Sequence, residues 1–192
     1  MTVKKEQEPE LISPKKPFVK DLLSTLLSLV IMAGIVLVIL NFVGSRVSVE
    51  GTSMYPTLND KDQLVEDILT YKFIREPKRF EIVIFKLKND PDTHYIKRVI
   101  GLPGETVQIA DSKIYINGEE LQEDYGRGVY FLAGSAAQPV VLGEDEYFVL
   151  GDNRNNSIDS RYAVGKVNRR QFTGRAIFRI WPFSGFGSVI DY

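Results

Sequence analysis

The longest uncharged stretch of the chain separates a short charged segment from everything that follows. It runs for 24 residues, from position 22 to position 45, between Asp21 and Arg46. A helix over residues 22–43 would be about 33 Å long, which matches the roughly 30 Å of hydrocarbon in a bilayer. The run exceeds the apolar region of about 7 to 15 residues in a cleaved secretory signal, and no cleavage site of the A-x-A kind follows it. The sequence therefore predicts one transmembrane helix.

Basic residues near the ends of this helix predict its orientation. Five lysines precede it within residues 1–21, whereas Arg46 alone lies close behind it. Because cytoplasmic flanks carry the excess of Lys and Arg, we expect residues 1–21 to form a cytoplasmic tail and residues 44–192 to lie outside the membrane. A fully extended connection from Val43 to Ser53 spans at most about 36 Å, so Ser53 would lie close to the membrane surface.

Charge and residue usage exclude several classes of site and partner. The 192 residues carry a formal net charge of −1, unlike the basic surface of a nucleic-acid-binding protein. The chain contains no cysteine, and His94 is its single histidine. Disulfides, thiolate metal sites and clusters of imidazole ligands are therefore excluded, and the carboxylates show no metal-binding spacing. We expect neither a metal site nor a nucleic-acid partner.

Short apolar runs separated by turn residues dominate the chain after Arg46. Val47 and Val49 alternate with polar residues, and further segments have the composition of strands: 64–69, 81–85, 95–100, 107–109, 114–116, 146–150 and 174–180. The dipeptide Asn117-Gly118 is the strongest two-residue hairpin signal in the sequence. We therefore expect an all-β domain with a small β insertion that begins near Glu105.

Ser53 lies in a compact polar turn, Gly51-Thr52-Ser53-Met54-Tyr55-Pro56, just after the apolar run. A serine in such a bend can hold its hydroxyl away from the backbone, with neighbouring N–H groups available to a negatively charged oxygen. The same residues are also typical of an ordinary turn. A role for Ser53 as a nucleophile therefore depends on finding a base.

Two residues compete for the role of that base. Strand alternation places Lys97 on one face with the apolar neighbours Tyr95 and Val99. Burial there would disfavour the charged ammonium and allow Lys97 to act as a base, although a strand lysine can also extend into solvent. His94 lies in the turn-rich segment 89–94 and faces away from Lys97 by parity, so we favour Lys97.

The densest polar stretch of the chain, residues 151–161, directly follows an apolar strand. It would need no special explanation as a surface loop. Its charges alternate in sign, however, and a loop mounted on the end of a strand is a common place for functional groups. A hydroxyl group here could orient Lys97, while Asp159 and Arg161 could pair to hold the loop in place.

Three motifs, in this order and spacing after a membrane helix, resemble the bacterial type I signal peptidase family. They are Gly-Thr-Ser53-Met-Tyr-Pro-Thr, Tyr-Ile-Lys97-Arg-Val-Ile-Gly-Leu-Pro-Gly and Gly-Asp-Asn-Arg-Asn-Asn-Ser157-Ile-Asp-Ser-Arg. The resemblance implies a membrane-anchored endopeptidase that removes signal peptides from exported preproteins. It implies that Ser53 is the nucleophile and Lys97 the general base. The supporting residues that it implies are Ser157, which would orient Lys97, Asp159 and Arg161, which would brace the site, and Asp152, which would be structural.

The fold that this resemblance implies is an all-β catalytic ectodomain with a small inserted β region, which we place at about 105–143, preceded by one N-terminal transmembrane helix. Some family members contribute a hydroxyl to the oxyanion hole from a serine two residues before the nucleophile, where this chain has Gly51. The backbone N–H of Ser53 remains as a donor, and Thr52 is the candidate substitute for the missing hydroxyl. Asn155 also stands where many relatives have aspartate.

The resemblance also implies the partners and the location of the protein. Its partners would be secreted preproteins, cut after a small-x-small motif, and the lipid bilayer. No cofactor is implied, because the nucleophile, the base and the oxyanion donors all belong to the chain. The expected location is the bacterial cell membrane, with a single span, a cytoplasmic N-terminus and an extracytoplasmic catalytic domain.

Two other classes of protein remain as alternatives. The first is a Ser-Lys autoprotease of the repressor-cleavage type, which the membrane helix and the lack of a DNA-binding segment argue against. The second is a membrane-anchored binding protein without activity, which the presence of both Ser53 and Lys97 disfavours.

An aromatic run near the C-terminus allows two interpretations. Trp181, Phe183 and Phe186 could rest on the bilayer interface, where such side chains lie at headgroup depth, or they could end an ordinary core strand.

Overall fold

The structure is a computed structural model that describes residues 18–42, 45–125 and 131–189. The chain divides into two compact units, Met1–Val38 and Ile39–Tyr192. Most of the predicted cytoplasmic tail lies outside the described residues.

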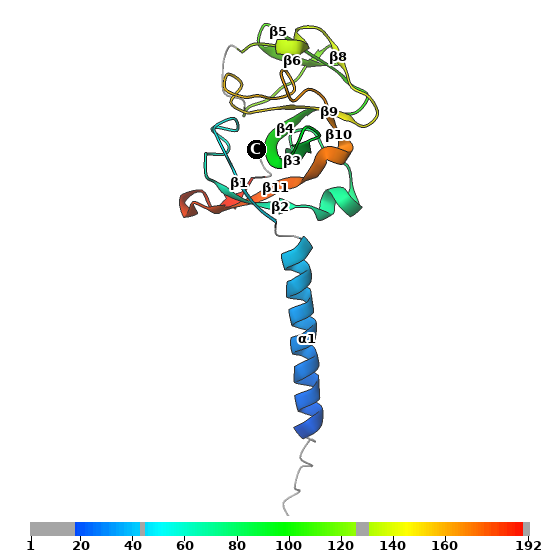
Figure 1. Cartoon of the computed structure of the whole chain (residues 1–192), viewed down its shortest axis with the longest axis vertical. Coiled ribbons are helices and arrows are strands. Elements are labelled where there is room, and N and C mark those ends of the chain that lie inside the picture. The colour runs from blue at the N-terminus through cyan, green and yellow to red at the C-terminus, as the bar shows by residue number, and fades with distance from the viewer. Residues whose placement is uncertain (1–17, 43–44, 126–130, 190–192) are drawn as a thin grey trace, which may run out of the picture. The chain divides into compact units, whose positions relative to one another are not determined.

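The helix α1 extends over Phe18–Phe42 and covers nearly all of the predicted apolar helix (Figure 1). Three of its hydroxyl groups, those of Ser24, Thr25 and Ser28, donate to carbonyl oxygens one turn earlier at 2.8–2.9 Å. Among the described residues, however, no helix combines the length and the apolar character needed to cross a membrane. The predicted transmembrane span is therefore not confirmed.

The second unit is mostly antiparallel β-sheet, as the alternating sequence pattern predicts. The larger sheet has eight strands in the order β1-β2-β11-β3-β4-β9-β10, with β12 paired to β11. These strands are β1 (Ser45–Ser48), β2 (Gln63–Asp67), β3 (Ile82–Leu87), β4 (Asp90–Gly101), β9 (Glu146–Leu150), β10 (Val167–Asn168), β11 (Phe172–Trp181) and β12 (Gly187–Ser188). Short helical turns lie between them at Thr70–Ile74, Gly134–Ala137, Arg169–Gln171 and Phe183–Gly185.

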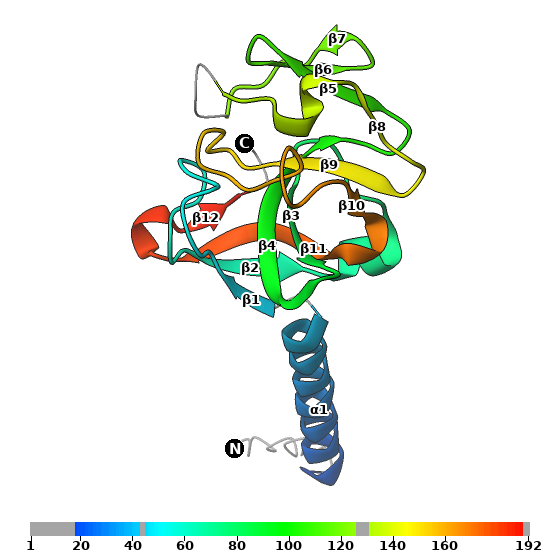
Figure 2. The ribbon, with the colours of Figure 1, turned by 45° about the horizontal axis from the view of Figure 1, so that its top comes forward.

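A smaller sheet lies within the predicted insertion at 105–143. Its order is β7-β6-β5-β8, formed by β5 (Thr106–Ala110), β6 (Lys113–Ile116), β7 (Glu119–Glu120) and β8 (Val140–Val141). Figures 1 and 2 show β5, β6 and β8 at one end of the β unit, beyond β9. The predicted hairpin at Asn117-Gly118 is confirmed, because both residues have positive φ angles and Ile116 pairs with Glu119 across them.

The strand β4 carries Lys97 and begins earlier than the sequence indicates. The segment 89–94 has the composition of a turn, yet β4 starts at Asp90. The tight turn falls instead at Lys88-Asn89, and pairing with β3 continues from there, where Leu87 pairs with Asp90. Pro91 is tolerated because β9 pairs with β4 only from Arg98 onward, which leaves the opposite edge of residues 91–97 without a strand partner in the described sheet.

Candidate active site

The turn that carries Ser53 connects β1 to β2 and is held in place by its apolar residues. Met54 and Leu58 are buried in the core formed by β1, β2 and β3, and the N–H of Leu58 donates to the carbonyl of Met54 at 2.9 Å. Gly51 opens the turn with φ of 84°, a conformation that favours glycine, and its N–H donates to Asp60 at 2.7 Å. The side chain of Ser53 therefore projects from a rigid bend at the surface of the sheet.

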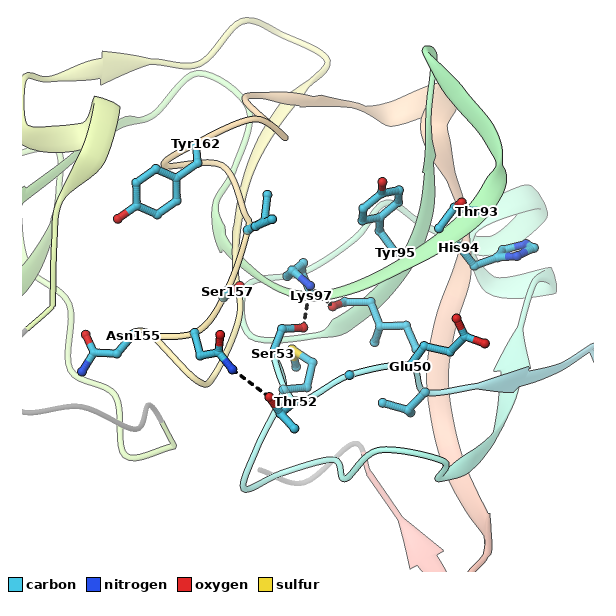
Figure 3. A pocket seen from close by; sticks show the side chains of 16 residues that line it. Glu50, Thr52, Ser53, Thr93, His94, Tyr95, Lys97, Asn155, Ser157 and Tyr162 are labelled. Carbon is cyan, nitrogen blue, oxygen red and sulfur yellow. Dashed lines mark hydrogen bonds between the residues drawn. The ribbon is translucent and has the colours of Figure 1, made fainter.

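Lys97 reaches Ser53 from the middle of β4. The Nζ atom of Lys97 lies 2.8 Å from Oγ of Ser53 and donates to the carbonyl of Ile96 at 2.9 Å (Figure 3). The Lys97 side chain is 5% exposed. The structure thus brings together the two residues that the sequence predicts as nucleophile and base, which are 44 positions apart.

The surroundings of Lys97 favour its neutral form. Burial lowers the pKa of Lys97 to about 8, because desolvation disfavours the ammonium, while the negative charges of Asp159 and Asp152 oppose this shift. In the neutral amine, the 2.8 Å contact can run from the Ser53 hydroxyl to the lone pair of Nζ. The pair is therefore arranged for proton transfer from serine to lysine near neutral pH.

His94 lies on the same strand but is exposed, and no hydrogen bond joins it to Ser53 within the described residues. Its ring also points away from Ser53 in Figure 3. The structure therefore places Lys97, and not the rival base, beside the hydroxyl.

Two buried ion pairs hold the polar loop after β9 beneath the site. The carboxylate of Asp152 accepts two hydrogen bonds from Arg98, at 2.9 and 2.6 Å, and the pair is almost completely buried. The carboxylate of Asp159 accepts two from the Arg161 guanidinium, at 2.9 and 2.8 Å, and one each from the backbone N–H groups of Arg161, at 3.2 Å, and Gly151, at 3.1 Å. The predicted pairing of Asp159 with Arg161 is therefore present in the structure. Removing one member of such a pair lowers the free energy of unfolding by about 3 to 5 kcal/mol, because the other charge stays buried without a partner.

Three further hydrogen bonds fasten this loop to the turn of Ser53. The N–H of Asn153 donates to the carbonyl of Ser53 at 2.9 Å, and the Asn153 amide donates to the carbonyl of Thr52 at 3.1 Å. The amide of Asn156 donates to the Thr52 hydroxyl at 2.9 Å. Sequence reasoning missed Arg98, Asn153 and Asn156. The signal that could have identified these three residues is that they lie inside the second and third motifs.

Ser157 lies beside the pair without bonding to it. Its Oγ is buried and has no hydrogen-bond partner among the described residues, so the predicted hydrogen bond to Lys97 is not seen. Nζ of Lys97 is directed instead at Ser53 and at the Ile96 carbonyl. Ser157 nevertheless lines the same cavity as Lys97 and packs against Gly151.

Donors for an oxyanion are available on the other side of Ser53. In the described part of the chain, the backbone N–H of Ser53 makes no hydrogen bond, so it is free to bind a ligand oxygen. The Thr52 hydroxyl accepts from Asn156, which leaves its own hydrogen to be donated.

A groove of about 710 Å³ contains Ser53 and Lys97. It is lined by residues 49–54, 93–97, 155–158 and Tyr162. Val49 and Ile96 line it as buried apolar residues, whereas Ser53, Lys97 and Ser157 contribute polar groups. Among the residues that the structure describes, no group of three or more His, Cys, Asp and Glu side chains could hold a metal ion.

Comparisons with known proteins identify a family and several similar proteins. The family described as signal peptidase, peptidase S26, matches residues 22–181. Signal peptidase I S of Bacillus subtilis is 37% identical over 174 residues, covering 86% of this chain and 92% of that relative. A probable signal peptidase I-2 of Synechocystis is 38% identical, covering 99% of this chain and 84% of that relative. A crystal structure of a signal peptidase I from Enterococcus faecalis is 36% identical with a TM-score of 0.45, covering 53% of this chain and 97% of that chain.

Proposed function

Because the chain belongs to the signal peptidase family of S26 peptidases, and is thus a serine endopeptidase, we propose that it cuts signal peptides from exported preproteins with a Ser53–Lys97 dyad. The observation that carries the proposal is the 2.8 Å contact between the Ser53 hydroxyl and the buried amine of Lys97. A serine hydroxyl is a weak nucleophile on its own and needs an adjacent base.

The reaction begins with proton transfer from Ser53 to neutral Lys97. The Ser53 oxygen attacks the scissile carbonyl, and the oxyanion that forms accepts hydrogen bonds from the N–H of Ser53 and from the Thr52 hydroxyl. The protonated Lys97 then gives its proton to the leaving amine, which completes the acyl-enzyme. In the second half, Lys97 takes a proton from the water that attacks the ester. Lys97 then returns this proton to the Ser53 oxygen as the signal peptide leaves with its new carboxyl group.

The residues of the polar loop keep this geometry in place. Asp159 and Arg161 brace the loop, and Asp152 with Arg98 fixes it to β4. Both carboxylates also limit how far burial lowers the pKa of Lys97. Ser157, whose Oγ has no partner in the described structure, is available to bind Lys97 during the proton transfers. The chemistry requires no cofactor.

The substrate would bind as an added strand. The edge of β4 over residues 91–97 faces the groove without a strand partner in the described sheet, and the segment before Ser53 forms the opposite wall. An extended peptide between them would form main-chain hydrogen bonds, and alternate side chains would point toward the same wall. Val49 and Ile96 are packed into the core and line this groove, so a large substrate side chain directed at them would have to displace them, which supports cleavage after a small-x-small motif.

A leucine scan of a synthetic preprotein tests this proposal. Leucine immediately before the cut, or two residues further upstream, should lower kcat/KM by about tenfold to a hundredfold, because a large side chain would displace packed core. Leucine at the intervening position should change kcat/KM by less than about threefold. Mass spectrometry of the products locates the cut. Equal losses at all three positions would contradict the proposed substrate class.

We also propose that the chain is anchored in the bacterial cell membrane by residues 22–43, with an extracytoplasmic β unit. The uncharged sequence of this segment and the five preceding lysines support this topology. Trp181, Phe183 and Phe186 are 51%, 74% and 59% exposed, which suits contact with lipid headgroups better than a core position. Protease added to intact protoplasts should digest the β unit; protection of that unit would reverse the topology.

A further inference from the structure

A second cavity, of about 330 Å³, continues the groove away from Ser53. It is lined by Ser45–Ser48 with Glu50 on one side and by residues 92–94 on the other. Glu50, Thr93 and His94 line both cavities. The groove therefore runs on between β1 and β4, toward the beginning of both strands.

Half of the residues that line the extension have ionisable side chains. Arg46, Glu50, Asp92 and His94 line it, and all four are exposed. None of the four forms a hydrogen bond or ion pair through its side chain with another residue in the described structure. By contrast, the charged residues beneath the active site are paired, as in Arg98–Asp152 and Arg161–Asp159. The charges of the extension are thus free to bind a ligand.

The spacing along the chain relates these charges to a bound peptide. If the residue before the cut lies beside Ser53, each preceding residue advances by about 3.3 Å along the groove. Glu50 lines both cavities, so it lies where the extension leaves the groove, and its carboxylate would lie next to a substrate residue about four positions before the cut. Arg46 is four residues further along the same wall, beside about the eighth position before the cut.

We propose that this extension binds the part of the preprotein four to seven residues before the cut, and that Glu50 favours a basic side chain at the position nearest to it. The inference rests on the proposed function, since it assigns a further specificity to the same groove. Glu50 is the acidic residue that lines both cavities, whereas Asp92 lines the outer one alone. Arg46 lies at the far end, where its positive charge would repel a basic substrate side chain. The preference for a basic residue is therefore restricted to the positions near Glu50.

The size of the effect follows from the exposure of these groups. Exposed ion pairs contribute about 0.2 to 1 kcal/mol, which corresponds to a change in kcat/KM of up to about fivefold. Because exposed charges are screened by salt, the preference should shrink strongly at about 1 M salt, where the Debye length is about 3 Å.

The experiment places lysine or glutamate singly at each of the four positions of a synthetic preprotein and measures the ratio of kcat/KM, lysine over glutamate. For the wild-type chain we expect a ratio of about threefold to fivefold at the position nearest Glu50. The ratio should fall to about one in Glu50→Gln and drop below one in Glu50→Lys. Glu144→Gln, which changes an exposed glutamate outside both cavities, should keep the wild-type ratio.

The outcomes separate this inference from the proposed function. Cleavage of the preproteins with a ratio of one at all four positions would overturn the inference and leave the proposed function intact. A preference that survives in Glu50→Gln but disappears in Asp92→Asn would overturn the assignment to Glu50. Absence of cleavage of every preprotein would overturn the proposed function and the inference with it.

Discussion

Replacing Lys97 by methionine or arginine is expected to lower kcat/KM for preprotein cleavage by at least about a thousandfold, as is replacing Ser53 by alanine. Methionine fills a similar volume but cannot accept the Ser53 proton. Arginine keeps its charge at every accessible pH, so it cannot act as a base. The double variant of Ser53 and Lys97 should be no worse than either single variant, because the two residues act as one unit.

Two controls make this prediction specific. Lys88→Arg changes an exposed lysine in the turn between β3 and β4 and should keep wild-type activity. Lys97→Met should unfold at a Tm no lower than that of the wild type, since methionine removes a buried amine and leaves no charge unpaired. Cleavage by Lys97→Met at more than a tenth of the wild-type kcat/KM would show that another residue is the base. A loss of the same size in His94→Ala would lead to the same conclusion.

Gly151→Ala is expected to reduce kcat/KM by about a hundredfold or more. A Cβ atom on Gly151 would lie 2.2 Å from Oγ of Ser157 and 2.5 Å from the carbonyl oxygen of Ser53. The second contact is with backbone, so it cannot be relieved by a change of side-chain rotamer. The turn of Ser53 and the loop after β9 must therefore shift relative to one another, and a displacement of about 1 Å can cost a hundredfold in rate.

Paired variants separate the two contacts of Gly151. Combining Gly151→Ala with Ser157→Gly removes the first clash and leaves the second, so activity should stay low. Gly143→Ala is the matched control, because the nearest atoms to its added Cβ belong to the Glu146 side chain, which can move. Gly151→Ala activity within threefold of wild type would show that the site tolerates movement of the Ser53 turn.

Local patterns in the sequence predict much of this fold. Strand β9 begins and ends where the apolar run 146–150 indicates, and the Asn117-Gly118 hairpin forms as its residue types require. The early start of β4 is not predicted by the local pattern, because pairing with β3 overrides the turn preference of the residues around Asp90. Secondary structure that depends on a partner strand cannot be read from the segment alone.

The candidate site, like the fold, has some features that the sequence motifs predict and others that depend on contacts between distant segments. The three motifs together predict Ser53 and Lys97, although neither residue is distinctive in its local segment alone. The contacts of Arg98 with Asp152 and of Asn156 with Thr52 join residues 54 and 104 positions apart, and no local sequence pattern predicts them. Whether Ser157 bonds to Lys97 depends on side-chain placement, and the structure shows Lys97 directed elsewhere.

The pH dependence of kcat/KM tests most directly whether neutral Lys97 is the base. Burial lowers the pKa of Lys97 to about 8, from an ordinary lysine value of about 10.4. Below this pKa, Lys97 is protonated and cannot accept the Ser53 proton, so kcat/KM should fall about tenfold for each unit of decreasing pH. Above it, kcat/KM should level off. The account predicts a rise with pH through an apparent pKa near 8 that is unchanged in His94→Ala; a pH dependence that disappears in His94→Ala would contradict it.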